Sequence, residues 1–156
     1  METDKQLLLR AIEIAGKGID KGGGPFGAVI SNDGIIIAEA YNSVVLNNDP
    51  TAHAEILAIR KASATLKSHN LGECTLYSSC EPCPMCLGAI YWAGIKKVVY
   101  ACDRVDAELA GFSDKLIYEE IVLDPAERRI DFIRISDTGA KEVFKKWDQL
   151  ETKMPY

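Results

Sequence analysis

The sequence has little that would suit a nucleic-acid-binding or membrane protein. It carries 18 lysines and arginines against 23 aspartates and glutamates, so its net charge is −5. Proteins that bind duplex DNA or tRNA usually have a basic excess, because neutralising phosphates supplies most of their affinity. No stretch approaches the roughly 20 apolar residues of a membrane span. We therefore expect a small ligand, and neither a nucleic-acid nor a membrane partner.

Other features are also missing. Residues Met1–Lys5 carry both signs of charge and lack the apolar core of a secretion signal. The five cysteines are an odd number, which argues against a disulfide framework and favours metal binding or catalysis. We expect a cytoplasmic protein. No internal repeat or Pro/Ser-rich linker divides the 156 residues, so the length predicts a single domain, 1–156.

Periodicity and turn residues predict an α/β fold. Residues 4–20 have helical spacing of apolar side chains and end at three glycines, and Asn32–Gly34 predicts a hairpin turn between antiparallel strands at 25–31 and 35–41. After a loop at 47–50, helices and strands alternate, which favours parallel pairing with helices on both faces. The predicted helices are 52–66, 84–93 and 142–150, and the predicted strands are 74–78, 97–101 and 132–135.

Two short motifs carry the chemistry. The first is His53-Ala54-Glu55, and the second is a C-x-x-C pair formed by Cys83 and Cys86. One imidazole and two thiolates are good zinc ligands, and three protein ligands leave a fourth position for water. The spacing of the cysteines lets both sulfurs meet one ion at a helix start, where the helix dipole favours thiolates. The motifs therefore predict one catalytic zinc ion per subunit, with His53, Cys83 and Cys86 as ligands.

Glu55 is the predicted general acid and base, because a carboxylate beside an activated water can move its protons. On an ideal helix, His53 and Glu55 would point to nearly opposite sides. Both reach one water only if the helix begins around His53, and the preceding Asp49-Pro50-Thr51 supports a start there.

Four other interpretations of these motifs remain open. A lone histidine is often a packed core residue, and a lone C-x-x-C is often a redox pair. Cys80, Cys83 and Cys86 resemble an iron–sulfur run, but that run needs a further cysteine near position 90, which is Ile90. A structural zinc site needs a fourth protein ligand. His69, Cys74, Cys80 and Cys102 are possible fourth ligands, although Cys80 is most simply a buried neighbour of the site.

The combined pattern, H-x-E followed by P-C-x-x-C, is the signature of zinc-dependent nucleobase deaminases. Nearly the whole chain resembles the cytidine-deaminase-like superfamily, and within it the bacterial guanine deaminases. The segments that carry the resemblance are GPFGAVI at 24–30, NNDPTAHAE at 47–55, CEPCPMCLGAIYWA at 80–93, AGFSD at 110–114 and the terminal Tyr156. The zinc motifs are specific for the superfamily, whereas the substrate assignment rests on Asp114, Tyr156 and the segment after Cys102.

The resemblance implies a three-layer α/β/α sandwich around a mixed five-stranded sheet. It also implies a homodimer whose C-terminal segment, about residues 137–156, swaps into the neighbouring subunit, so that Tyr156 closes the partner's site. The expected reaction is hydrolysis of guanine to xanthine and ammonia, in which water attacks C2 and the 2-amino group leaves.

Roles for further residues follow from the same resemblance. Asp114 would accept hydrogen bonds from the N1–H and 2-amino edge of guanine, a donor pair that adenine does not offer. Asn42 would contact the base's ring edge, and Phe26 and Trp92 would stack on the purine. From residue type alone, Asp114 is equally suited to capping a helix, Asn42 to a turn, and the two aromatics to core packing.

Two rival enzymes share the motifs. A tRNA adenosine deaminase needs a basic surface, which a net charge of −5 does not favour. A deaminase of guanosine or of another amino-substituted heterocycle would share every motif, because the sequence does not reveal whether the pocket has room for ribose. A non-enzymatic zinc module is the alternative from another class.

Overall fold

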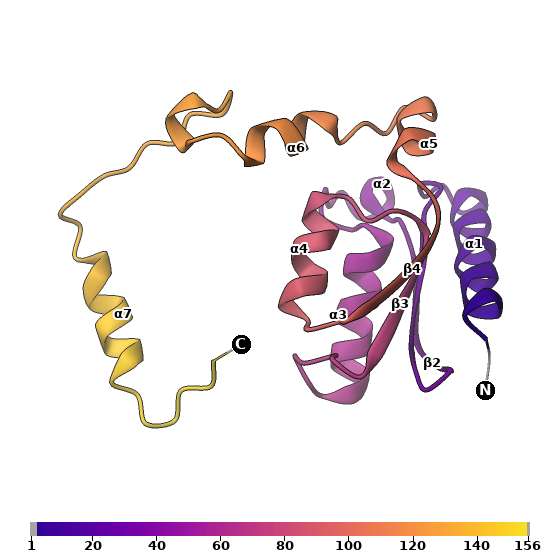
Figure 1. Ribbon diagram of the computed structural model, residues 1–156, viewed down its shortest axis with the longest axis horizontal. Helices are drawn as coiled ribbons and strands as arrows, with labels where there is room; N and C mark the ends of the chain where they lie inside the picture. The colour runs from indigo at the N-terminus through magenta and orange to yellow at the C-terminus, as the bar shows by residue number, and fades with distance from the viewer. Residues whose placement is uncertain (1–2, 156) are drawn as a thin grey trace. The chain divides into compact units, whose positions relative to one another are not determined.

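The computed structural model describes residues 3–155 and divides into two compact units, Met1–Asp114 and Lys115–Tyr156. The first unit contains a four-stranded sheet in the order β2-β1-β3-β4, covered by helices on both faces (Figure 1). Helix α1 (Asp4–Asp20) lies on one face, and α3 (Ala54–Leu66) and α4 (Pro84–Trp92) lie on the other. The α/β class and the three layers are therefore confirmed.

The predicted hairpin forms the antiparallel half of the sheet. Strands β1 (Gly27–Asn32) and β2 (Ile35–Tyr41) pair in antiparallel register around Asp33 and Gly34, both of which have positive φ. Aspartate and glycine tolerate that backbone conformation, which matches the twist of a two-residue hairpin. Strand β3 (Cys74–Cys80) then pairs antiparallel with β1 and parallel with β4 (Lys97–Cys102). The crossover helix α4 makes the parallel pair possible.

Helix α1 is held in place by a cap at its N-terminus and by its apolar face, which packs against the sheet. Thr3 caps its N-terminus through a reciprocal bond with Gln6, and Leu7, Ala11 and Ile14 bury its apolar side against the sheet. A Cβ on Gly27 would lie 2.2 Å from the Ala11 carbonyl oxygen, so glycine is required for the close approach of β1 to this helix.

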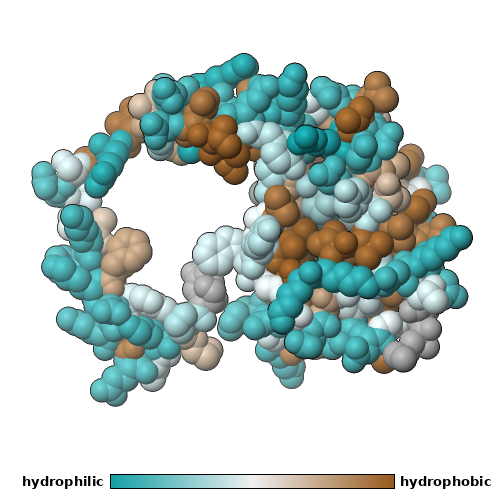
Figure 2. Space-filling view, in the orientation of Figure 1, coloured by the Kyte–Doolittle hydropathy of each residue, from teal (hydrophilic) through white to brown (hydrophobic). Residues whose placement is uncertain are grey.

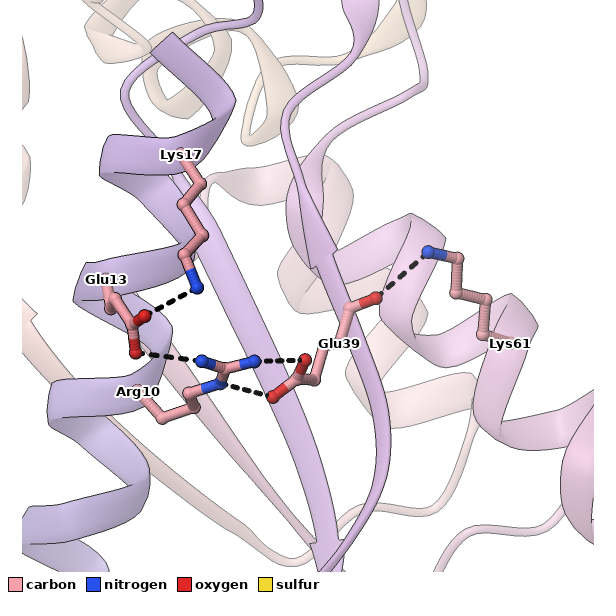
Figure 3. Close-up of polar contacts among 5 residues, drawn as sticks. All are labelled: Arg10, Glu13, Lys17, Glu39 and Lys61. Atoms are coloured by element: carbon pink, nitrogen blue, oxygen red, sulfur yellow. Dashed lines mark hydrogen bonds and ion pairs between the residues drawn. The ribbon is translucent and has the colours of Figure 1, made fainter. Parts of the chain in front are cut away.

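An ion-pair network joins α1 to the far edge of the sheet (Figure 3). The Arg10 guanidinium donates to both carboxylate oxygens of Glu39 on β2, at 2.6 and 2.9 Å, and to Glu13 at 2.8 Å. Lys17 pairs with Glu13, and Lys61 of α3 donates to the Glu39 carbonyl at 2.9 Å. Two helices on opposite faces are thus tied to the same edge strand.

The core on the other face positions the candidate site. Small side chains of α3, namely Ala54, Ala58 and Ala62, pack against the sheet beside Leu76 of β3 and Ile90 of α4. The N-termini of α3 and α4 lie at the same end of the sheet, because these helices follow β2 and β3, which both run antiparallel to β1. The short helix α2 (Val44–Asn47) precedes them and covers part of a stretch that was predicted to be a loop.

The second unit has helices α6 (Lys115–Ile121) and α7 (Ala140–Asp148) and the 3-10 turn η1 (Pro125–Glu127). No described residue between 115 and 155 is buried. Its apolar side chains lie at the surface, as the hydrophobic residues along α6 illustrate in Figure 2. Helix α5 (Arg104–Leu109) belongs to the first unit.

The prediction of a fifth strand at 132–135 was wrong for the described chain. Phe132, Ile133 and Ile135 have no strand assignment and are exposed. A strand forms only when its backbone pairs with a neighbouring strand. An apolar pattern in the sequence does not by itself provide that neighbouring strand. Within residues 3–155, no helix is both long and apolar enough to cross a membrane.

Candidate metal centre and active site

The N-termini of two helices, α3 and α4, bring the three predicted zinc ligands together. His53 is the N-cap of α3, with extended backbone at φ −67° and ψ 154°, and Cys83 is the N-cap of α4 at φ −65° and ψ 169°. Pro84 opens α4, where a missing N–H costs nothing, and Cys86 follows in the first turn. Both helices direct their positive ends toward the same place, which favours anionic ligands there.

The three donor atoms have the spacing of a zinc site. The His53 Nδ1 lies 3.5 Å from the Cys83 Sγ and 3.6 Å from the Cys86 Sγ. All three donor atoms lie within 4.8 Å of one another. A tetrahedral zinc with Zn–N of about 2.1 Å and Zn–S of about 2.3 Å places nitrogen and sulfur about 3.6 Å apart. The residues present therefore fit a zinc ion with three protein ligands.

The two thiols differ in acidity because they interact with each other. The hydrogen bond from Cys86, followed by that from His53, lowers the pKa of Cys83 to about 4. The same pairing, together with burial, raises the pKa of Cys86. The bond to Cys83 in turn raises the pKa of His53. One thiolate thus forms readily, whereas the second requires a cation to compensate its charge.

Glu55 is the second helical residue of α3 and is 5% exposed. Its Oε1 accepts a hydrogen bond from the Ser78 hydroxyl at 3.2 Å, and its Oε2 lies 3.5 Å from the Cys86 Sγ. Burial raises the pKa of this carboxyl above its ordinary value. Because His53 is outside the helix in extended conformation, its side chain and that of Glu55 reach one site, which resolves the geometric difficulty noted in the sequence.

The pKa of the Asp114 carboxyl is raised above its ordinary value. Burial is the main cause that raises its pKa, and the negative charge of Cys83 adds to the effect. Asp114 is half-buried and ends the first unit.

Asn42 is buried at the end of β2, where its Oδ1 accepts a hydrogen bond from the Val44 N–H at 3.3 Å. The Asn42 backbone is held on both sides by the glycine-rich segment, since Gly24 donates to its carbonyl and its own N–H donates to the Phe26 carbonyl. The side chain is therefore fixed by local structure, as a turn residue would be, while remaining near the strand end that faces the site.

The two aromatic candidates have different environments. The ring of Phe26 packs edge-on against Phe112 at 5.0 Å, and it lines a cavity of about 260 Å³ with Ser79, Cys80 and Ala107. Trp92 is 70% exposed at the end of α4, six residues beyond Cys86. Tyr156 lies outside the described residues.

The remaining cysteines are not part of the ligand group within residues 3–155. Cys80 is buried, its thiol donates to the Asp103 carbonyl at 3.4 Å, and burial raises its pKa to about 11. Cys74 packs in the core and Cys102 is exposed, and all five cysteines are free. The sequence analysis missed Ser78, whose only signal was a hydroxyl residue in the strand that leads to Cys83.

Comparison with known proteins agrees with this geometry. Residues 1–102 match the family model of the cytidine and deoxycytidylate deaminase zinc-binding region. The chain is 52% identical over 151 residues to the guanine deaminase of Bacillus subtilis, covering 96% of this chain and 97% of that protein. The crystal structure of the Bacillus subtilis guanine deaminase superposes with a TM-score of 0.96 at 50% identity and covers 99% of both chains.

More distant relatives match less of the chain. A solved guanine deaminase of Nitrosomonas europaea has a TM-score of 0.71 at 34% identity, over 74% of this chain and 67% of its own. A tRNA-specific adenosine deaminase of Haemophilus influenzae is 41% identical over 100 residues, which are 64% of this chain and 58% of that protein. Residues 1–102, which the family model matches, contain both ligand-bearing helices, and the chain therefore belongs to the zinc-binding cytidine and deoxycytidylate deaminase family.

Proposed function

We propose that this enzyme catalyses the zinc-dependent hydrolysis of guanine to xanthine and ammonia. The observation that carries the proposal is the 52% identity to a guanine deaminase across 96% of the chain. The zinc-binding region ends at Cys102, and the similarity to this guanine deaminase continues beyond it. Asp114 lies in that later part of the chain. The tRNA-specific relative matches only 64% of the chain, and the net charge of −5 gives no general basic surface for tRNA.

The chain's own residues supply binding and proton transfer. Zinc, when held by His53, Cys83 and Cys86, activates water as a nucleophile at neutral pH. Glu55 accepts a proton from the attacking water and delivers it to N3 of guanine as the C2–O bond forms. Its buried position and raised pKa suit a carboxyl that must hold a proton briefly near neutral pH.

In this proposal, Asp114 and Asn42 orient the substrate. The Asp114 carboxylate accepts from N1–H and the 2-amino group. As the C2–N bond breaks, it relays to the amine the proton that the added C2 hydroxyl gives up, so that the amine leaves as ammonia and C2 becomes a carbonyl. Adenine has no such donor pair, so it would leave the half-buried carboxylate unpaired. The Asn42 amide contacts the ring edge, while Phe26 and Trp92 provide apolar surface for the purine.

The direct test is release of xanthine and ammonia from guanine by zinc-loaded protein, with guanosine, adenine and cytosine run in parallel. Conversion of guanine alone is the expected result. Conversion of guanosine at a similar kcat/KM would change the substrate to a nucleoside. No conversion of guanine would overturn the proposal.

We also propose that the active form is a cytoplasmic homodimer with exchanged C-terminal segments, about residues 137–156. Residues 115–155 bury none of their side chains, although α7 exposes Val143, Phe144 and Trp147. On the first unit, Leu87, Tyr91 and Trp92 of α4 are exposed as well. A 41-residue segment without a core gains stability only by covering another surface. Free thiols that bind metal suit a reducing compartment.

A complementation experiment tests the exchange. Glu55→Gln lacks the proton carrier and Tyr156→Ala lacks the terminal ring, so each homodimer should be nearly inactive. If the terminal segment closes the partner's site, co-expression yields mixed dimers in which one site has both Glu55 and Tyr156. Recovery of activity with the mixed dimer is expected. No recovery in a purified mixed dimer would overturn the exchange of Tyr156.

A further inference from the structure

Ser78 is a buried hydroxyl at the metal centre that the proposed mechanism does not use. It lies on β3, five residues before Cys83, and is 1% exposed. Along this strand, Leu76 points to the core shared with α3 and α4, whereas Tyr77 packs against α1. Alternation places Ser78 on the same face as Leu76, directly toward the N-terminus of α3.

The hydroxyl has one partner that matters for chemistry. The Ser78 Oγ donates to the Glu55 Oε1 at 3.2 Å, because an ionised carboxylate can only accept. Both atoms are in buried residues, so the bond is protected from water. A hydrogen bond to a charged group in such surroundings contributes more than one between neutral groups.

The strand holds this donor rigidly. Ser78 is paired with Ala28 of β1 on one side and with Tyr100 of β4 on the other. Its Cα position is therefore set by two neighbouring strands. Glu55 comes from a different element, α3, and its carboxyl also interacts with its own backbone N–H and with Cys86. The bond from Ser78 joins this carboxyl to the sheet.

The other carboxylate oxygen has the sulfur of a predicted zinc ligand as its side-chain neighbour. The Glu55 Oε2 lies 3.5 Å from the Cys86 Sγ. A sulfur that ligates zinc does so as thiolate and carries no proton to donate. The Oε2 is thus left available for the water and the base, while Oε1 is held by Ser78.

We propose that Ser78 is a positioning residue for the proton carrier: its hydroxyl orients the Glu55 carboxylate so that the free oxygen faces the attacking water. The inference rests on the proposed function, in which Glu55 moves the proton. It adds that the strand-borne hydroxyl, and not the metal ligands alone, sets the geometry of that transfer.

The test compares Ser78→Thr with Ser78→Val, measured on guanine. Both variants introduce the same branched volume at one buried position, but only threonine keeps the hydroxyl. We expect kcat of Ser78→Val to be about 10- to 100-fold below that of Ser78→Thr, with KM changed by less than about threefold. Zinc content and the thermal midpoint should be the same for both variants.

A second serine provides the control. Ser31 of β1 is 2% exposed, and its hydroxyl interacts with Tyr77 instead of the metal centre. Ser31→Thr and Ser31→Val should therefore show equal kcat. If branched side chains at position 78 prevent folding, Ser78→Ala removes the oxygen without adding volume, and its kcat should fall by a similar factor relative to wild type.

The outcomes separate the inference from the proposed function. Wild-type protein that does not convert guanine would overturn the proposed function and the role of Ser78 with it. Active wild type with equal kcat for the threonine and valine variants would overturn the role of Ser78 only. A loss of kcat that follows loss of zinc in Ser78→Val and Ser78→Ala alike would assign Ser78 to metal retention and overturn the inference.

Discussion

The His53 Nδ1 and the Cys83 Sγ lie 3.5 Å apart, although each belongs to the N-cap of a different helix. Neither side chain bonds to its own helix backbone, as most N-cap side chains do. Both are instead directed at each other and at Cys86. At these two helix N-termini, the position that serine or aspartate usually occupies is taken by a predicted metal ligand. The metal ion would supply the positive charge that the thiolates require.

Removing a ligand should remove the zinc. We expect His53→Ala and Cys83→Ala to lower zinc from one ion per chain to near zero, because two remaining ligands bind too weakly. The exposed Cys102 provides the control, so Cys102→Ser should keep one zinc per chain. Metal analysis after gel filtration measures both. Retention of full zinc by Cys83→Ala would exclude Cys83 as a ligand.

Glu55→Gln should separate metal binding from turnover. Glutamine keeps the shape of the side chain but does not carry the proton, so we expect zinc content to be unchanged and kcat to fall by about 10²- to 10⁴-fold. Steady-state kinetics and metal analysis on the same preparation check this expectation. Substantial turnover by the zinc-loaded variant would remove Glu55 from proton transfer.

Asp114→Asn should affect guanine conversion without disturbing the centre. The amide presents an N–H₂ group where the carboxylate accepts two hydrogen bonds, so we expect kcat/KM to fall by at least about 10²-fold with zinc intact. Asp33→Asn is the matched control, because Asp33 lies in the remote hairpin turn at φ 48°, a conformation that asparagine also tolerates. Equal kcat/KM for the two variants would exclude Asp114 from substrate recognition.

Local patterns predicted most of the first unit from the sequence. The periodic apolar residues of α1, the Asp33-Gly34 turn and the β3–α4–β4 alternation all depend on neighbours in the chain, and each was found. The metal centre was predictable for the same reason, since two short motifs fix its ligands and Asp49-Pro50-Thr51 indicated the helix start beside His53.

Features that depend on distant partners were not predictable in the same way. The pattern at 132–135 is strand-like, but a strand requires a neighbouring edge, which the sequence does not specify. The bond from Ser78 to Glu55 joins residues 23 apart and depends on how far α3 lies above the sheet. A serine in the strand that precedes the cysteine motif is compatible with such a contact, but it does not identify the partner.

Stability should depend on pH through the Glu39 carboxyl, which the Arg10 guanidinium holds at a pKa below its ordinary value of 4.5 (Figure 3). A lowered folded pKa stabilises the protein above the ordinary value, and that contribution is lost as the pH falls through the folded pKa. We expect Glu39→Gln to lower the free energy of unfolding by about 0.5–1 kcal/mol at pH 7 and by almost nothing at pH 3.

Urea unfolding of wild type and Glu39→Gln at both pH values measures this difference. Glu73→Gln, a change at an exposed glutamate outside this network, is the control and should have little effect at either pH. A difference between wild type and Glu39→Gln that persisted unchanged at pH 3 would mean that packing, and not the ion pair with Arg10, accounts for it.

Gly24→Ala should weaken substrate binding through Asn42. A Cβ at position 24 would lie 2.9 Å from the Asn42 Oδ1 and 3.0 Å from its Cγ, so the amide must shift. We expect KM for guanine to rise about fivefold while zinc content stays constant, because a misplaced amide loses a contact worth about 1 kcal/mol. Gly16→Ala is the matched control, since a Cβ there meets nothing within 4 Å and should stabilise α1 by about 0.5–1 kcal/mol. An unchanged KM in Gly24→Ala, with Gly16→Ala behaving as wild type, would show that Asn42 does not contact the base.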